Sequence, residues 1–380
     1  MIRKSTDNAK VKHGGIHAAS LLSRALFALD TAGFFFNTAI QFLGRERTET
    51  MVDMVLCRQL AEAVGAGDSP MVPRIFQALV TEEEAKVLLL AAPPATADDL
   101  AQKSGLSLEA MEAMMDSLFH RGLIFKATRG GEMKFYRVKN IPQMHDSTTL
   151  TPGISRDILD LWKEYMEKEW PEYGNKIMDL MPGSLMRVVP VNEGIEPQSQ
   201  ILAYEDVVKI IEHAKTLSVT ACSCRVIDGA CGKPLEVCMQ VDRAAEYNIE
   251  RGTGRELSKG EAIEILKKCE DAGLVHTVDN RQVVGHVICN CCKDCCLNWA
   301  IMKGPKKWVA PSRFLAVVDE DLCIGCEACV DRCFFDALAV PDNVAVVDAE
   351  KCLGCGVCTV SCPTEALKLK EVRPVDFVPV

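Results

Sequence analysis

The sequence predicts a multi-domain α+β protein. The chain of 380 residues exceeds the length of one ordinary domain, and its hydrophobic content of 48% is enough for a core in each of several. Helical periodicity dominates the first third, whereas strand-like runs and cysteine-rich loops dominate the rest. We expect five segments: a helical segment at 1–74, three helices and two strands at 75–140, a connector at 141–200, an α+β cysteine-rich and metal-binding domain at 201–312, and a second cysteine-rich module at 313–380.

The number and clustering of the cysteines indicate the chemistry of this protein. Of 19 cysteines, 17 lie in clustered motifs between residues 222 and 362, and Cys57 and Cys269 are isolated. Disulfides on this scale would require export, but the N-terminal apolar stretch is interrupted by Arg24 and Asp30 and has no clear cleavage site. The sequence has no uninterrupted run of about 18 apolar residues, so no transmembrane segment is predicted. The sequence therefore predicts a cytoplasmic protein, in a reducing and anaerobic setting where dense cysteine motifs bind metal.

Charge is uneven along the chain. The net charge is −10, and residues 313–380 alone carry 6 Lys or Arg against 12 Asp or Glu. Such an acidic module repels nucleic acid and favours a partner protein with a basic docking surface. We therefore expect a redox partner or a larger complex, and no nucleic acid.

Residues 75–140 show a helical and hairpin pattern. Helices are predicted at 82–92, 96–105 and 108–120, and strands at 123–127 and 134–138. This order resembles the winged-helix domains of bacterial regulators, which implies a DNA-binding fold. The helix at the recognition position carries Glu109, Glu112 and Asp116, and the segment holds 8 basic and 9 acidic side chains. We expect this fold to serve dimerisation or partner docking; DNA binding through the basic wing is the alternative. The apolar segment 17–43 is a candidate core or dimer interface, so a homo-oligomer is expected.

The middle of the chain holds nine cysteines in two groups, each after a strand-like run at 217–221 or 283–288. If these strands are neighbours, both groups lie at one end of a sheet. A helix capped by Ser258 and a hairpin starting at residue 274 separate them. The candidate ligands of a third metal centre are Cys222, Cys224, Cys231, Cys238, Cys289, Cys291, Cys292, Cys295 and Cys296.

The content of this centre stays open at the level of sequence. At least one further iron–sulfur cluster is the preferred interpretation, and zinc and redox-active or structural thiols are the alternatives. Cys291 and Cys292 are adjacent, so we expect their side chains to point to different sides. Arg225 is predicted either to stabilise negative charge on a bound group or to form a surface ion pair. His276 and His286 are candidate ligands, although a structural role is the more common one for a lone histidine.

The C-terminal module contains an internal repeat. Its two runs both read C-x2-C-x2-C-x3-C, and each cysteine of the first run recurs at a constant interval in the second. In such a pair of runs, three thiolates bind one [4Fe–4S] cluster and the fourth cysteine binds the cluster of the other run. The predicted ligand sets are Cys323, Cys326, Cys329 and Cys362 for one cluster, and Cys352, Cys355, Cys358 and Cys333 for the other.

This doubled pattern resembles the two-cluster bacterial ferredoxins over most of the C-terminal module. The resemblance implies a ferredoxin-like fold, two [4Fe–4S] clusters and electron transport. Phe334 stands where that family usually has proline. The acidic surroundings favour the oxidised state, so we expect low potentials.

These observations predict an iron–sulfur protein that passes low-potential electrons between a redox partner and a second cysteine-bound centre in the middle domain. Two alternatives stay open: a redox-sensing winged-helix transcriptional regulator, and an iron–sulfur reductase with a substrate site in the middle domain. In the latter case the chain would be an oxidoreductase or a component of one.

Overall fold

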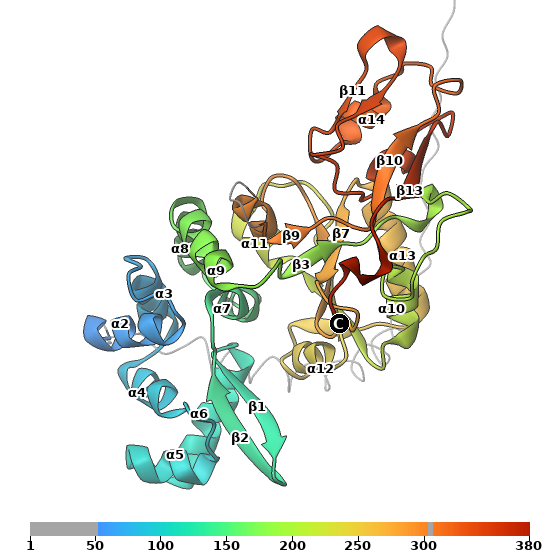
Figure 1. Ribbon diagram of the computed structural model, residues 1–380. Helices are drawn as coiled ribbons and strands as arrows, with labels where there is room; N and C mark the ends of the chain where they lie inside the picture. Colours follow the sequence, from blue (N-terminus) through green and yellow to red (C-terminus); the bar gives the residue numbers. More distant parts are fainter. Residues whose placement is uncertain (1–51, 303–306) are drawn as a thin grey trace, which may run out of the picture. The chain divides into compact units, whose positions relative to one another are not determined.

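The structure is a computed structural model that describes residues 52–302 and 307–380 (Figure 1). The predicted apolar segment 17–43 lies outside the described residues. Mixed helices and strands confirm the expected α+β class. No helix in the described ranges is long and apolar enough to cross a membrane.

The N-terminal part is helical up to a two-stranded hairpin. Thr81 and Thr96 begin two of the helices with capping boxes, in which the threonine hydroxyl and the carboxylate three residues later bind each other's backbone N–H. The predicted three helices and two strands are present within a few residues, while the resemblance to winged-helix domains stays a prediction. The elements are α2 (Met54–Ala63), α3 (Val72–Leu79), α4 (Glu82–Leu90), α5 (Ala97–Ser104), α6 (Leu108–His120), β1 (Ile124–Arg129) and β2 (Glu132–Arg137).

Three helices follow the hairpin: α7 (Ile141–Thr148), α8 (Arg156–Lys168) and α9 (Trp170–Leu180). Trp162, Tyr165 and Trp170 are fully buried in the same core as the N-terminal helices. Residues of the expected connector therefore contribute large apolar side chains to that core.

A seven-stranded sheet forms the centre of the middle region, in the order β6-β4-β5-β8-β7-β3-β9. All neighbouring strands are antiparallel except β3 and β9, which are parallel. The strands are β3 (Met186–Val188), β4 (Leu217–Ala221), β5 (Glu236–Val241), β6 (Gly254–Glu256), β7 (Val275–Asp279), β8 (Val287–Cys291) and β9 (Val309–Ala310). The helical elements of this region are η1 (Asn192–Gly194), α10 (Val207–His213), α11 (Ser223–Asp228), α12 (Arg243–Glu250), α13 (Lys259–Asp271) and η2 (Leu297–Ile301).

Two details of the predicted sheet are corrected. The hairpin that starts at residue 274 exists, and its second strand is β8 at Val287–Cys291, which begins four residues later than the strand-like run at 283–288. The strands before the two cysteine groups, β4 and β8, are not neighbours, because β5 lies between them. Both are antiparallel to β5, so they run in the same direction and end at the same edge of the sheet. The expected convergence of the two cysteine groups is therefore achieved with an intervening strand.

The C-terminal segment is built from two similar halves. β10 (Phe314–Val318) pairs with β13 (Leu367–Glu371), and β11 (Leu338–Ala339) pairs with β12 (Val346–Val347), both antiparallel (Figure 1). Short helices α14 (Ala328–Arg332) and α15 (Val357–Val360) each follow a cysteine loop, and η3 (Pro341–Asn343) and η4 (Val375–Phe377) complete the segment. Asp336 and Glu365, which occupy equivalent positions in the two halves, both have positive φ, so the backbone repeats along with the sequence.

Specific contacts attach this segment to the middle region. The Val191 N–H donates to the carbonyl of Cys355 at 2.9 Å, and the Glu196 N–H donates to that of Leu369 at 2.9 Å. The buried Arg313 guanidinium donates to Glu205 at 2.8 Å and also contacts Glu371. These contacts involve β13 and the second cysteine loop. The first half is attached as well, because the Arg332 guanidinium donates to the carbonyls of Glu270 at 2.8 Å and Asp271 at 2.9 Å.

Candidate metal centres

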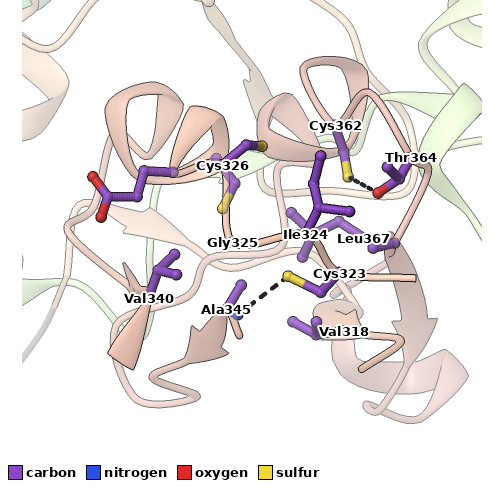
Figure 2. A pocket seen from close by; sticks show the side chains of 13 residues that line it. Val318, Cys323, Ile324, Gly325, Cys326, Val340, Ala345, Cys362, Thr364 and Leu367 are labelled. Carbon is purple, nitrogen blue, oxygen red and sulfur yellow. Dashed lines mark hydrogen bonds between the residues drawn. The ribbon is translucent and has the colours of Figure 1, made fainter. Parts of the chain in front are cut away.

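Four thiols line one cavity of the C-terminal segment. Cys323, Cys326 and Cys329 come from the first cysteine run and Cys362 from the end of the second. Figure 2 shows the labelled side chains of Cys323, Cys326 and Cys362 around this cavity. Burial raises the pKa of the Cys329 thiol, and the other three thiols raise it as well because they are close enough for their negative charges to repel. We call these four residues the outer set.

The other four thiols of the segment, Cys333, Cys352, Cys355 and Cys358, form an inner set. Burial raises the pKa of Cys355 to about 12, and the nearby charges of Cys352 and Cys333 act in the same direction. Burial also raises the pKa of Cys358, where the next contributors are again members of this set. Three thiols of one run and the last thiol of the other therefore lie together in each set. The charge of Cys329 reaches Cys358 as well, so the two sets are adjacent.

The loops around both sets are shaped to bring backbone close. Gly325 and Gly354 share a φ of +66°, and a Cβ would lie 2.6 Å from the Asn343 oxygen at the first and 2.1 Å from the Phe314 oxygen at the second. Backbone N–H groups also reach the sulfurs: that of Ala345 donates to Cys323 at 3.4 Å. Such donors stabilise negative charge on thiolates. Four convergent thiols with N–H donors in glycine-lined loops fit the ligand set of a [4Fe–4S] cluster.

Comparison with known proteins identifies the segment that contains these thiols. Residues 316–369 match the family described as 4Fe-4S dicluster domain. This segment is a 4Fe–4S dicluster domain. It implies two [4Fe–4S] clusters, so the expected C-terminal cofactors and the iron–sulfur character of the chain are confirmed. A search of curated proteins finds no match to the chain.

Outside the dicluster domain, three middle-region thiols form a compact triad. The Cys292 sulfur lies 3.0 Å from that of Cys295 and 3.5 Å from that of Cys231, and all three lie within 4.8 Å of one another. Cys292 directly follows β8, Cys295 comes three residues later, and Cys231 lies in the loop between α11 and β5. A hydrogen bond from Cys295 lowers the pKa of Cys292 to about 5, and the positive charge of Arg225 also lowers it.

The other six predicted ligands form a second group, which we call the six-thiol group. The sulfurs of Cys291 and Cys296 lie 3.2 Å apart. Hydrogen bonds with Cys222 and Cys296 lower the pKa of Cys224, and hydrogen bonds with Cys289 and Cys296 lower that of Cys291. The members are Cys222, Cys224, Cys238, Cys289, Cys291 and Cys296. Adjacent Cys291 and Cys292 thus belong to different groups, as their predicted opposite orientation requires.

Arg225 lies between these two groups. It is only 3% exposed, so the predicted surface ion pair is wrong. Its guanidinium donates to the carbonyls of Pro234 at 2.6 Å and Asn290 at 2.7 Å. Although burial lowers the pKa of Arg225, the charges of Cys222 and Cys292 raise it overall. Arg225 is therefore a buried charge beside thiols, and its role toward a bound group stays a prediction.

The two histidines have other partners. The ring of buried His276 contacts the Asn290 amide oxygen at 2.5 Å through Nδ1 and Glu270 at 3.3 Å through Nε2, so both nitrogens are occupied. His286 contacts Asp279 at 3.2 Å, and its side chain is 73% exposed. Both arrangements agree with the structural role that the sequence favoured.

An aromatic cluster joins the middle thiols to the inner set. Trp299 comes three residues after Cys296, and its ring lies 4.9 Å from that of Phe334 and 5.4 Å from that of Phe335, measured between centroids. Phe334 directly follows Cys333, a member of the inner set. The departure from proline at this position thus supplies a packing partner for Trp299. Sequence reasoning noted the departure but missed the contact, for which the paired phenylalanines were the available signal.

Proposed function

We propose that this chain is a cytoplasmic iron–sulfur protein that passes low-potential electrons between a redox partner and a second cysteine-bound centre in its middle domain. The observation that carries the proposal is the order of the thiol groups. The outer set is the more exposed one, the inner set touches the sheet region, and the six-thiol group follows across the Trp299 contact. This order is what a chain of one-electron carriers requires, and [4Fe–4S] clusters supply one-electron chemistry when bound.

The ligand assignment of the dicluster domain rests on the two thiol sets. The outer set, Cys323, Cys326, Cys329 and Cys362, would hold one cluster, and the inner set, Cys352, Cys355, Cys358 and Cys333, would hold the other. Support comes from the shared cavity of the outer set and from the mutual electrostatic effects within each set. The crossing of the fourth cysteine keeps both clusters close together.

The six-thiol group is the proposed site of the additional iron–sulfur centre. It offers more thiols than the four that one cube requires. Thr277 and Asn298 lie 3.6 Å from the Cys291 sulfur and add polar contacts. This group would be the electron acceptor on the far side of the inner set.

The partner would approach the outer set. Cys326 and Glu327 are exposed, as are the acidic Glu320 and Asp321 before the first cysteine. A basic rim on the partner would complement this surface. In the N-terminal part, Lys126 of the predicted wing pairs with Glu250 at 2.5 Å, so the positive charge of this lysine is already neutralised within the protein. This supports partner docking or dimerisation over DNA binding for residues 75–140.

The proposed domain limits are those expected from the sequence: 1–74, 75–140, 141–200, 201–312 and 313–380. Arg313 lies at the last limit and is bound by Glu205 of the preceding domain. Removing residues 313–380 would leave Glu205 buried without its partner. The function is therefore best tested on the full chain with point variants.

The decisive experiment is iron and sulfide counting with EPR on the anaerobically purified full chain. Wild type should bind about twelve irons, because the dicluster domain accounts for about eight and the six-thiol group for the rest. Cys326→Ser and Cys291→Ser should each lose about four. Electrons added by dithionite should reach the middle centre rapidly in wild type. A wild-type count of about eight irons would refute an iron–sulfur acceptor in the middle domain.

A further inference from the structure

The sulfurs of Cys231, Cys292 and Cys295 all lie within 4.8 Å of one another. In a tetrahedral site one ion takes all ligands, and a zinc–sulfur bond of about 2.3 Å places the sulfurs about 3.8 Å apart. The triad sulfurs are separated by 3.0 and 3.5 Å along two edges and by no more than 4.8 Å along the third. This spacing suits a single ion.

The chain segments that carry the triad also suit a single ion. Cys292 and Cys295 form a C-x2-C loop, the ligand spacing common in zinc sites, and the Cys295 backbone N–H binds the Cys292 sulfur. Cys231 completes the triad from a separate loop. In the described part of the chain, no fourth Cys, His, Asp or Glu joins these three at metal-binding distance.

Arg225 balances the charge of such a site. Three thiolates and one divalent ion sum to a charge of −1, and the guanidinium supplies +1. Arg225 hydrogen-bonds to Cys292 and feels the charge of Cys231, and no ion pair with a carboxylate is found for it among the described residues. Its Nε is buried and has no hydrogen-bond partner, so one donor stays free. A buried guanidinium without a carboxylate partner is suited to an anionic neighbour.

We propose that Cys231, Cys292 and Cys295 bind a single zinc ion, with Arg225 as counter-charge, and that the fourth coordination position is open to water or a small anion. The site is separate from the six-thiol group, since Cys291 and Cys292 belong to different groups. Cys231 and Cys295 are partly exposed, so solvent reaches this side. Three protein ligands with an open position are the arrangement of reactive zinc sites, whereas structural sites are closed by a fourth ligand. The proposal does not depend on electron transfer.

The first test is zinc analysis and zinc K-edge X-ray absorption on the anaerobically purified full chain. This edge does not detect iron, so the iron–sulfur clusters do not interfere. We expect about one zinc per chain, with three sulfur atoms at about 2.3 Å and one oxygen or nitrogen. Four sulfur atoms around zinc, or a preparation without zinc that takes none up, would overturn the proposal.

The second test uses Cys295→Ser, with Cys57→Ala as the matched control because Cys57 lies in α2, outside all thiol groups. Cys295→Ser should lose most of its zinc and keep its iron, and Cys57→Ala should keep both. Loss of about four irons in Cys295→Ser would show that the triad binds a cluster instead. Should this variant fail to fold, wild type stripped with a chelator and titrated with zinc must show one tight site.

The third test addresses the open position. Azide added to the wild-type protein should change the light-atom shell at the zinc edge while the three sulfur atoms remain. Arg225→Met should weaken azide binding by about tenfold, and Arg225→Lys should restore part of it, because a cation near the ion favours an anionic ligand. An azide-insensitive zinc edge in wild type would show a closed site and would overturn this part of the proposal.

Discussion

The two halves of the dicluster domain share one cysteine spacing and differ in their surroundings. In the first loop Ile324 is 64% exposed, whereas its counterpart in the second loop, Leu353, is partly buried against the larger hydrophobic core. Cys326 is exposed, but the carbonyl of its counterpart Cys355 accepts a hydrogen bond from Val191. The comparison teaches that the repeat determines which thiols gather, while the neighbouring chain determines which set faces solvent and which faces the middle thiols.

One pair of equivalent residues shows most clearly how the surroundings of the two halves differ. Glu327 and Gly356 both adopt a left-handed conformation before a short helix, with φ of 61° and 77°. At Gly356 a Cβ would lie 2.8 Å from the Leu369 side chain and 3.3 Å from the Val191 nitrogen. At 327 the side chain is exposed, so a glutamate is tolerated despite its backbone strain. The inner half requires glycine because another part of the chain occupies the space.

The largest effect is expected when the contact between Arg313 and the middle region is broken. Arg313→Ala should lower the free energy of unfolding by about 3–5 kcal/mol, because it leaves the buried Glu205 carboxylate without a counter-charge. Denaturant unfolding under anaerobic conditions measures the loss. Lys368→Ala is the control: it removes an exposed ion pair with Glu365 on the same domain and should cost at most about 1 kcal/mol. Equal losses of unfolding free energy in both variants would mean that the buried Arg313 ion pair contributes no more to stability than an exposed one.

Substitutions at the two left-handed residues should distinguish the surroundings of the two halves directly. Gly356→Glu should destabilise the protein by about 3 kcal/mol, because the side chain has no space and its charge would be buried. Glu327→Gly should be neutral or stabilising by up to about 1 kcal/mol, because glycine adopts positive φ without strain. Thermal unfolding followed by cluster absorbance gives both values. Similar losses from the two substitutions would contradict the proposed difference in surroundings.

Sequence reasoning succeeded where chemistry is encoded locally. The spacing of Cys323, Cys326 and Cys329 is visible along the chain, and so is the helix cap at Ser258, which forms a capping box with Glu261. It was less successful where distant segments meet. Nothing near Cys292 in the sequence shows that the distant Cys231 lies 3.5 Å away, because β5 brings the two loops together. For the same reason Arg225 could not be recognised as buried from its own neighbours.

The aromatic contact between the inner set and the middle region should have a moderate effect. Trp299→Leu should reduce stability by about 1 kcal/mol through loss of the ring contacts with Phe334 and Phe335, with unchanged iron content. If this contact positions the inner set against the six-thiol group, electron transfer to the middle centre should slow severalfold, measured by rapid freeze-quench EPR. Phe76→Leu is the control, since Phe76 is a fully buried ring of α3 in the N-terminal part. Equal slowing in both variants would assign the effect to general loosening of the fold.

The smallest expected effect concerns surface charge near the two cysteine runs. Asp321 and Glu350 are equivalent in the repeat and both are exposed, but Asp321 precedes the exposed loop of the outer set. Asp321→Asn should slow reduction of a small cationic acceptor, hexaammineruthenium(III), by about twofold at low salt, because it removes one attractive charge from the site of electron exit. Glu350→Gln should change this rate little, and salt should abolish the difference. If Glu350→Gln has the larger effect, electrons leave through the inner half, and the assignment of outer and inner sets to partner and relay must be reversed.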